Sequence, residues 1–256
     1  MLTELKENVH DTNPHPDSLM ATLADWFECG LFAGFRLSEW AQEASASRME
    51  TFQLDVHGDA KALCLGDVRF ASSTGARVSA ADAVAAPPGT QFDKCWITFR
   101  TQKNGENGEE KLFTRNTNRG GMCFVSAMLR IVRRFARIRS AQDLATPLAL
   151  YKGSPTCDAP SFVTSVQIEK MMRSLASKVY SLHPVKDKAK LQRWSSHSLR
   201  VAACMILHAL GFTETQIKFL LRWRSNAFMM YLRNSAILAN FQNEVLDRAM
   251  AMPNFL

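Results

Sequence analysis

The chain has 256 residues, of which 46% are apolar, so it is long enough to bury a substantial core. No apolar stretch approaches the length of a membrane span, and the N-terminus lacks the pattern of a signal peptide, which argues against membrane and secreted proteins. The net charge of +7 suits a polyanionic partner without identifying one. We therefore expect an intracellular protein, located in the nucleus if eukaryotic and otherwise in the cytoplasm.

The N-terminal part of the chain predicts a polar tail followed by helices. Residues 1–17 are polar and contain Asn13-Pro14-His15-Pro16, which favours a tail or the remnant of a linker. Asp17 or Ser18 can cap a helix that begins at Leu19. A second helical stretch opens at Arg36, shortly after Gly34.

The middle of the chain predicts a small antiparallel sheet. Residues 62–70 and 95–100 are short β-branched or aromatic runs typical of strands, and residues 72–93 form a long connection between them. Asn-Gly occurs twice after residue 103, which predicts a hairpin that returns through residues 111–114 and carries Lys103 at its tip.

The remainder of the chain is predicted to be helical, with a possible short strand at 148–151 and a basic loop at 186–193. The expected helices cover residues 122–137, 165–180, 198–210, 213–221, 225–232 and 236–250. Gly211 suits a helix C-cap, and Thr213 with Gln216 forms a capping box. The fold class is therefore mainly α with a small three-stranded antiparallel β-sheet.

Positive charge is concentrated between residues 94 and 139, where eleven Lys and Arg stand against three Glu. This segment is the best candidate for a phosphate-facing surface. A solvated helix face is the alternative for the arginines between Arg130 and Arg139.

The cysteines are scattered, contain no C-x-x-C pair and mostly lie inside apolar runs, so we expect reduced core thiols. The six positions are Cys29, Cys64, Cys95, Cys123, Cys157 and Cys204. Cys204 and His208 are four residues apart, but two ligands do not make a zinc site, and we expect no metal.

Three motifs near the end of the chain carry the chemistry. They are His197-Ser198-Leu199-Arg200, then Arg222-Trp223-Arg224, then Tyr231-Leu232-Arg233-Asn234. In this order and spacing the sequence resembles the tyrosine recombinase (phage integrase) family, and its Cre-like members in particular. The residues Arg222-Trp223-Arg224-Ser225 and Tyr231-Leu232-Arg233-Asn234 are also similar to motifs in recombinases of DIRS- and Crypton-type mobile elements.

The resemblance extends to the family's other motifs. Gly34-Phe35-Arg36-Leu37-Ser38-Glu39 matches the box that contributes the first arginine, and Lys103 lies at a hairpin tip as the family's lysine does, with Lys111 as the alternative. The resemblance implies a catalytic set of Arg36, Lys103, His197, Arg200, Trp223 and Tyr231. We expect further DNA contacts from Arg100, Arg115, Arg119, Arg222 and Arg224.

The chemistry of DNA transesterification requires residues of these types. Charge gathers on the phosphate oxygens, so Arg36 and Arg200 suit the task as permanently charged planar forks, and Trp223 adds a neutral N–H donor. Tyr231 is the nucleophile, His197 assists its ionisation or tunes the arginines, and Lys103 protonates the leaving 5'-oxygen. No metal or other cofactor is needed.

Each residue also has an ordinary structural interpretation. Arg36 with Glu39 can be an i,i+3 pair, Lys103 a turn lysine, and His197 a helix N-cap. Trp223 and Tyr231 can be core aromatics. The sequence also departs from the family pattern: Arg36 and Lys103 are 67 residues apart, and the interval from Trp223 to Tyr231 is eight, one residue shorter than in Cre-like members.

We therefore expect a tyrosine recombinase catalytic domain over residues 18–256, without the family's usual N-terminal clamp domain. The chain would then be a catalytic domain alone, a fragment, or a member that relies on another polypeptide. The partners would be double-stranded DNA and, on paired sites, three further copies in a homo-tetramer. Helix 236–250 either docks on a neighbouring copy or packs on its own domain. The alternatives are a recombinase-derived protein that binds DNA without cutting it, and a topoisomerase-like strand transferase.

Overall fold

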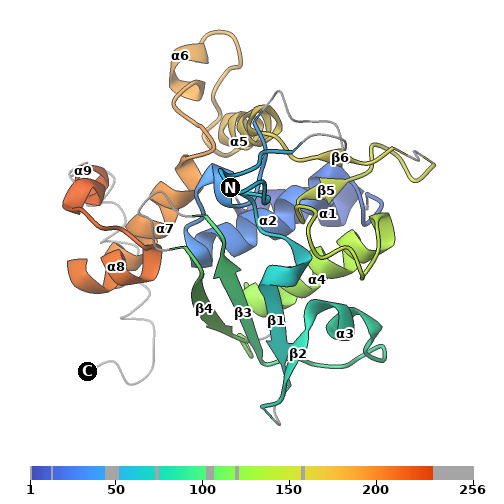
Figure 1. Ribbon diagram of the computed structural model, residues 1–256. Coiled ribbons are helices and arrows are strands. Elements are labelled where there is room, and N and C mark those ends of the chain that lie inside the picture. Colours follow the sequence, from blue (N-terminus) through green and yellow to red (C-terminus); the bar gives the residue numbers. More distant parts are fainter. Residues whose placement is uncertain are drawn as a thin grey trace. The chain divides into compact units, whose positions relative to one another are not determined.

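A computed structural model describes residues 2–12, 14–43, 52–72, 75–101, 107–118, 121–156 and 159–232 (Figure 1). Helices and one small antiparallel sheet dominate these residues, which confirms the mixed helical and β class. The chain divides into two compact units: Met1–Cys29 with Arg36–His197 form the first, and Gly30–Phe35 with the residues from Ser198 on form the second. The single catalytic domain over residues 18–256 stays a prediction. None of the described helices has the length and apolar character to cross a membrane.

The sheet of the first unit has four antiparallel strands in the order β2-β1-β3-β4 (Figure 1). Their bounds are Val68–Ala71 for β1, Arg77–Ser79 for β2, Lys94–Phe99 for β3 and Glu109–Thr114 for β4. The predicted hairpin is confirmed, with Cys95 paired to Phe113. The prediction of three strands was wrong, because the segment expected to be a connection contributes β2 and the helix α3 (Ala80–Ala85), whose first turn Ser79 caps.

Helix α4 (Phe124–Ile138) packs its apolar face against β3 and β4. On β3 the residues alternate between the two faces of the sheet, so that Cys95, Ile97 and Phe99 are buried. The rings of Phe113 on β4 and Phe124 on α4 stack with centroids 3.6 Å apart. This contact joins the sheet to the start of α4.

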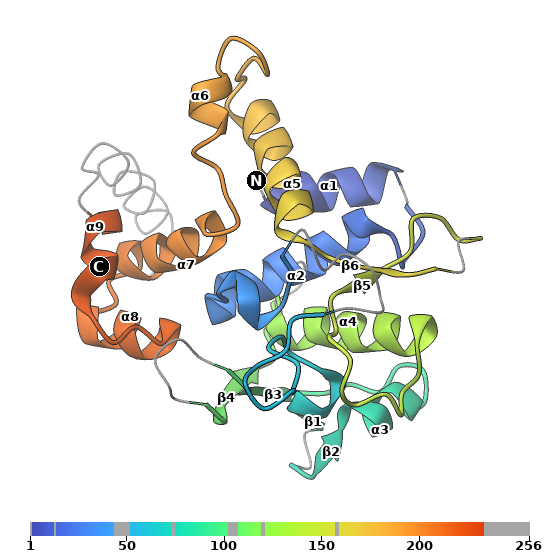
Figure 2. The same ribbon diagram turned by 45° about the horizontal axis from the view of Figure 1, so that its top comes forward.

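The N-terminal residues form a helix, α1 (Leu2–Thr12), where the sequence predicted a polar tail. Its Leu5 is fully buried and Lys6 Nζ lies 2.8 Å from Glu28 Oε2, so the helix is part of the first unit. It lies beside α5 (Ser165–Val179), as Figure 2 shows. The apolar residues Leu2, Leu5 and Val9 follow helical spacing, which is a weak signal for this helix because the segment is otherwise polar.

Helix α2 (Leu19–Ala33) belongs to the first unit except for its last turn, which belongs to the second. The other elements of the first unit are short. Ser18 caps α2 as predicted, since its Oγ accepts a hydrogen bond from the Ala21 N–H at 3.2 Å. A short helix, α6 (Lys188–Leu191), occupies the segment predicted to be a basic loop. The remaining elements are the 3₁₀ helices η1 (Leu37–Glu39) and η3 (Leu65–Asp67) and the paired strands β5 (Leu150–Tyr151) and β6 (Ser161–Phe162).

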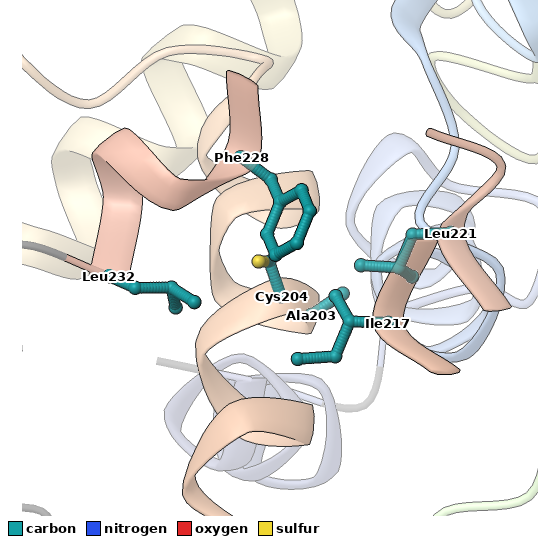
Figure 3. Close-up of a cluster of buried hydrophobic side chains, with 6 residues drawn as sticks. All are labelled: Ala203, Cys204, Ile217, Leu221, Phe228 and Leu232. Carbon is teal, nitrogen blue, oxygen red and sulfur yellow. The ribbon is translucent and has the colours of Figure 1, made fainter. Parts of the chain in front are cut away.

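The described part of the second unit is a small helical cluster. It contains α7 (Ser198–Ala209), α8 (Glu214–Leu221), the 3₁₀ helix η4 (Asn226–Phe228) and α9 (Met229–Leu232). Figure 3 shows the buried side chains that these helices direct toward one another, namely Ala203, Cys204, Ile217, Leu221, Phe228 and Leu232. The predicted helix 236–250 lies outside the described residues, so its docking and the homo-tetramer stay predictions.

The predicted caps between α7 and α8 are confirmed. Gly211 has a left-handed φ of 82°, and the Phe212 N–H donates back to the Leu207 carbonyl at 3.1 Å, which ends α7. Thr213 then caps α8, and the Gln216 side chain accepts from the Thr213 N–H at 2.8 Å. Two consecutive helices are therefore separated by signals that are local in the sequence.

Five cysteines, Cys29, Cys64, Cys95, Cys123 and Cys204, are buried free thiols, as predicted. Cys157 lies outside the described residues.

Candidate functional site

Arg200 occupies the first turn of α7 and is only 2% exposed. Its Nη2 donates to the Leu221 carbonyl at 2.5 Å, and its Nη1 donates to the carbonyl of Gly34. Its Cζ lies 4.6 Å from the centroid of the Trp223 ring, within the range of a cation–π contact. The guanidinium is therefore held in one position by the backbone at two places and by an aromatic face.

Trp223 connects Arg200 to Tyr231 within the second unit. The Tyr231 ring, on α9, meets the Trp223 ring edge to face, with centroids 5.8 Å apart and an interplanar angle of 65°. The Phe228 ring also packs on this indole, with the ring centroids 5.9 Å apart. Three of the six predicted catalytic residues, Arg200, Trp223 and Tyr231, are thus brought together from α7, the end of α8 and α9.

The Nε1 of Trp223 is buried and has no hydrogen-bond partner among the described residues. A buried donor without an acceptor costs about 1–3 kcal/mol, and proteins leave few such groups unsatisfied. An anionic oxygen that approached this N–H would remove the cost. The indole is therefore suited to donate to a ligand oxygen next to Tyr231.

Arg222 has a structural role in the second unit, and its predicted contact with DNA stays a prediction. It is 4% exposed, and its Nη1 donates to the Ala33 carbonyl at 2.9 Å. Together, Arg222 and Arg200 satisfy the carbonyls of Ala33 and Gly34 at the C-terminal end of α2, where the helix dipole favours cations. Arg224, two residues later, is exposed and remains a candidate for a DNA contact.

The backbone of Arg222 turns the chain toward the site. The residue has φ 56° and ψ 49°, the left-handed conformation, and ends α8. The Trp223 N–H donates to the Lys218 carbonyl at 2.9 Å across this turn. Glycine is the usual residue in such a position, so the conformation of Arg222 is strained.

Whether the other predicted catalytic residues join this cluster stays a prediction. Arg36 and His197 are part of the first unit, and Lys103 lies outside the described residues. Arg36 Nη1 is 2.9 Å from Glu39 Oε1, so the ordinary i,i+3 pair is present. His197 is exposed and directly precedes α7. The alternative lysine, Lys111 on β4, has its Nζ 5.8 Å from the Phe113 ring centroid.

Two further predicted DNA contacts are engaged inside the first unit. Arg100 Nε lies 2.6 Å from Asp67 Oδ2, and burial raises the pKa of Asp67 despite this hydrogen bond. Arg115 Nη1 donates to the Phe92 carbonyl at 3.2 Å. Arg119 lies outside the described residues. Arg100 and Arg115 directly follow β3 and β4, so these contacts hold the ends of the two strands.

Acidic side chains pair with three of the four arginines on α4. That this segment faces phosphate stays a prediction. Arg130 and Arg134 both bind Asp25 on α2, at 2.6 and 2.5 Å. Arg137 Nη2 lies 2.6 Å from Asp17 Oδ1. The alternative of a solvated face was wrong for Arg134, which is 4% exposed.

Asp25 and Glu28, both buried on α2, are residues that sequence reasoning missed. Besides its pair with Lys6, Glu28 accepts from Arg130 Nη2 at 3.0 Å and from the Cys123 N–H at 2.6 Å. A signal was present, because two acids three residues apart in an otherwise apolar helix require buried cations nearby.

Within the described ranges, no group of three or more His, Cys, Asp or Glu side chains is arranged to hold a metal ion. Comparison with protein-family models finds no match for this chain, and comparison with curated proteins finds none either.

Proposed function

We propose that the protein breaks and rejoins DNA through Tyr231, as a site-specific recombinase of the tyrosine type. The observation that carries the proposal is the cluster in the second unit, where Arg200 lies against Trp223 and Trp223 against Tyr231. The order and spacing of these residues in the sequence predict the same chemistry. A cation, a buried N–H donor and a phenol together suit an attack on a phosphodiester.

In the proposed reaction the Tyr231 oxygen attacks the phosphorus, and its proton passes to His197. The bond from phosphorus to the 5'-oxygen breaks, and Lys103 protonates that oxygen. The products are a 3'-phosphotyrosyl link and a free 5'-hydroxyl, and a 5'-hydroxyl from a second duplex reverses the step. Arg36, Arg200 and Trp223 stabilise the negative charge on the phosphate oxygens.

A second candidate is a recombinase-derived protein that binds DNA without cutting it. It is favoured by the burial of Arg200, whose guanidinium donates to the carbonyls of Gly34 and Leu221. To contact a phosphate, Arg200 must exchange at least one of these bonds. The two candidates differ in one observable, a covalent bond between the protein and DNA.

The test uses nicked duplexes that trap the covalent intermediate, analysed on denaturing gels. We expect an adduct that maps to Tyr231 and that disappears in Tyr231→Phe, which keeps DNA binding. The matched control is Tyr180→Phe, because Tyr180 is 55% exposed and stacks on Trp194, a residue of the first unit. An adduct on Tyr151 or Tyr180 would overturn the assignment, and DNA binding without any adduct would favour the second candidate.

The proposed chemistry also predicts resistance to chelation. The cations at the phosphate are side chains, so the adduct should form equally well in an excess of chelator. Loss of the adduct in chelator and its recovery with magnesium would indicate another class of nuclease. DNA binding should weaken steeply with salt, because Lys and Arg that contact phosphates release counterions.

A further inference from the structure

A groove of about 580 Å³ lies in the first unit between α1, α2, α4 and the segment from Pro14 to Pro16. Five basic side chains line it, and the other lining residues are Asp25 and small apolar side chains such as Ala21. We call it the basic groove; its cations are Lys6, Arg130, Arg133, Arg134 and Arg137. Its volume is typical of small-molecule sites.

The arginines of the basic groove occupy one face of α4, since their positions follow the helical spacing i, i+3, i+4, i+7. Asp25 lies between two of them, with Oδ1 2.6 Å from Arg130 Nε and Oδ2 2.5 Å from Arg134 Nη2. Arg134 Nε also donates to the Pro16 carbonyl at 2.8 Å. These bonds fix the guanidinium groups before any ligand arrives, which lowers the entropic cost of binding.

The basic groove has more positive than negative charge. Its five cations face three carboxylates, those of Asp17, Asp25 and Glu28, so two positive charges are not balanced there. Arg133, which also lines the groove, makes no hydrogen bond or ion pair with any of the described residues. Arg134, which is 4% exposed, has an Nη1 without an acceptor in the same part of the chain. Both features call for an additional anionic acceptor.

We propose that the basic groove binds a small phosphorylated molecule, of the chemical class of a nucleotide. A phosphate dianion matches the surplus of two charges, and guanidinium forks bind phosphate oxygens in pairs. The prolines and alanines of the lining suit the flat, weakly polar body of a base. Because Arg134 is buried, a rigid duplex does not bring a backbone phosphate to it.

The test is calorimetric titration of the full chain with ADP and with pyrophosphate, in the absence of DNA. We expect both to bind, ADP more tightly, and Arg133→Gln to weaken both by about tenfold or more, because a charge-assisted bond is lost. The matched control is Arg69→Gln on β1, which removes the same charge from an exposed position outside the groove. It should leave both affinities unchanged.

A second variant tests the apolar side of the basic groove. Ala21→Phe fills part of the groove and should weaken the binding of ADP more than that of pyrophosphate. Circular dichroism verifies that the variant folds. If neither ADP nor pyrophosphate binds the wild-type chain at millimolar concentration, the groove is not a ligand site. Equal affinities for the two probes would overturn the nucleotide class. Since the groove lies in the first unit and the assay contains no DNA, these outcomes are independent of strand exchange at Tyr231.

Discussion

Arg222 combines a strained backbone with a buried charge, next to the cluster of Arg200, Trp223 and Tyr231. Its left-handed φ of 56° costs an ordinary residue about 1 kcal/mol relative to glycine. Its hydrogen bond to the Ala33 carbonyl offsets that cost, since a buried carbonyl without a donor is itself unfavourable. The two contributions can be separated by substitution.

We expect Arg222→Ala and Arg222→Gly both to lower the free energy of unfolding, by about 1–3 kcal/mol, because each leaves the Ala33 carbonyl without its donor. Arg222→Gly should be the more stable of the two by about 1 kcal/mol, since glycine adopts a positive φ without strain. The midpoints of urea denaturation measure both values. A glycine variant no more stable than the alanine variant would contradict the role of backbone strain.

At the scale of elements, the turn after α2 depends on a close approach between Gly34 and α8. Gly34 has φ 56°, and a Cβ at this position would lie 2.6 Å from Leu221 Cδ2. Leu221 is fully buried, so it has no room to move away. Glycine is required here by both its conformation and the space available.

Gly34→Ala should therefore lower the free energy of unfolding by about 1 kcal/mol because of the positive φ. Overpacking against Leu221 should lower it by about 1–3 kcal/mol more. Gly211→Ala is the matched control, since its φ is 82° but no atom lies within 4 Å of the added Cβ. Thermal denaturation should show a clearly larger loss of stability for Gly34→Ala than for Gly211→Ala. Equal losses would mean that the helices move apart at little cost.

Elements whose signals are local in the sequence could be predicted, and those that depend on distant partners could not. Ser18 and Thr213 mark the starts of α2 and α8 through hydrogen bonds to residues three positions away. By contrast, helix α1 depends on the burial of Leu5 and on Lys6 pairing with Glu28. Leu2, Leu5 and Val9 follow helical spacing, but this short pattern does not reveal either contact.

The same distinction applies to the candidate site. The order of Arg200, Trp223 and Tyr231 predicted a cluster, and their ring contacts confirm that they lie together. The role of Arg222 was missed because its acceptor, the Ala33 carbonyl, is 189 residues away in the chain. Likewise, Asp25, which pairs with two arginines of α4, lies about a hundred residues before them, so the arginines gave no sign of this partner.

At the scale of the whole molecule, buried thiols make stability depend on alkaline pH. Burial raises the pKa of Cys204 from its ordinary value of 9.0 to about 11 and that of Cys64 to about 12, and it also raises the pKa values of Cys29 and Cys95 well above the ordinary value. Above pH 9 the unfolded chain releases these protons while the folded chain keeps them. The free energy of unfolding therefore falls as pH rises, by up to about 1.4 kcal/mol per pH unit for each thiol.

We expect the wild-type chain to lose stability between pH 9.5 and 10.5 and the Cys204→Ala variant to lose it less steeply. The control is Cys123→Ala: burial tends to raise the pKa of Cys123, but hydrogen bonds from Ser126, Asn116 and Val125 lower it overall, so this thiol does not contribute to the loss. Urea titrations across this pH range measure the slopes. Identical slopes for wild type and Cys204→Ala would refute the assignment to Cys204.

The hydrogen bonds from Arg200 and Arg222 to the end of α2 span 166 and 189 residues of chain. During synthesis, the carbonyls of Ala33 and Gly34 leave the ribosome long before either arginine has been made. The second unit therefore cannot assemble progressively from the N-terminus, and its folding must wait for closure of a very long loop. Until then, the carbonyls of Ala33 and Gly34 must accept their hydrogen bonds from water.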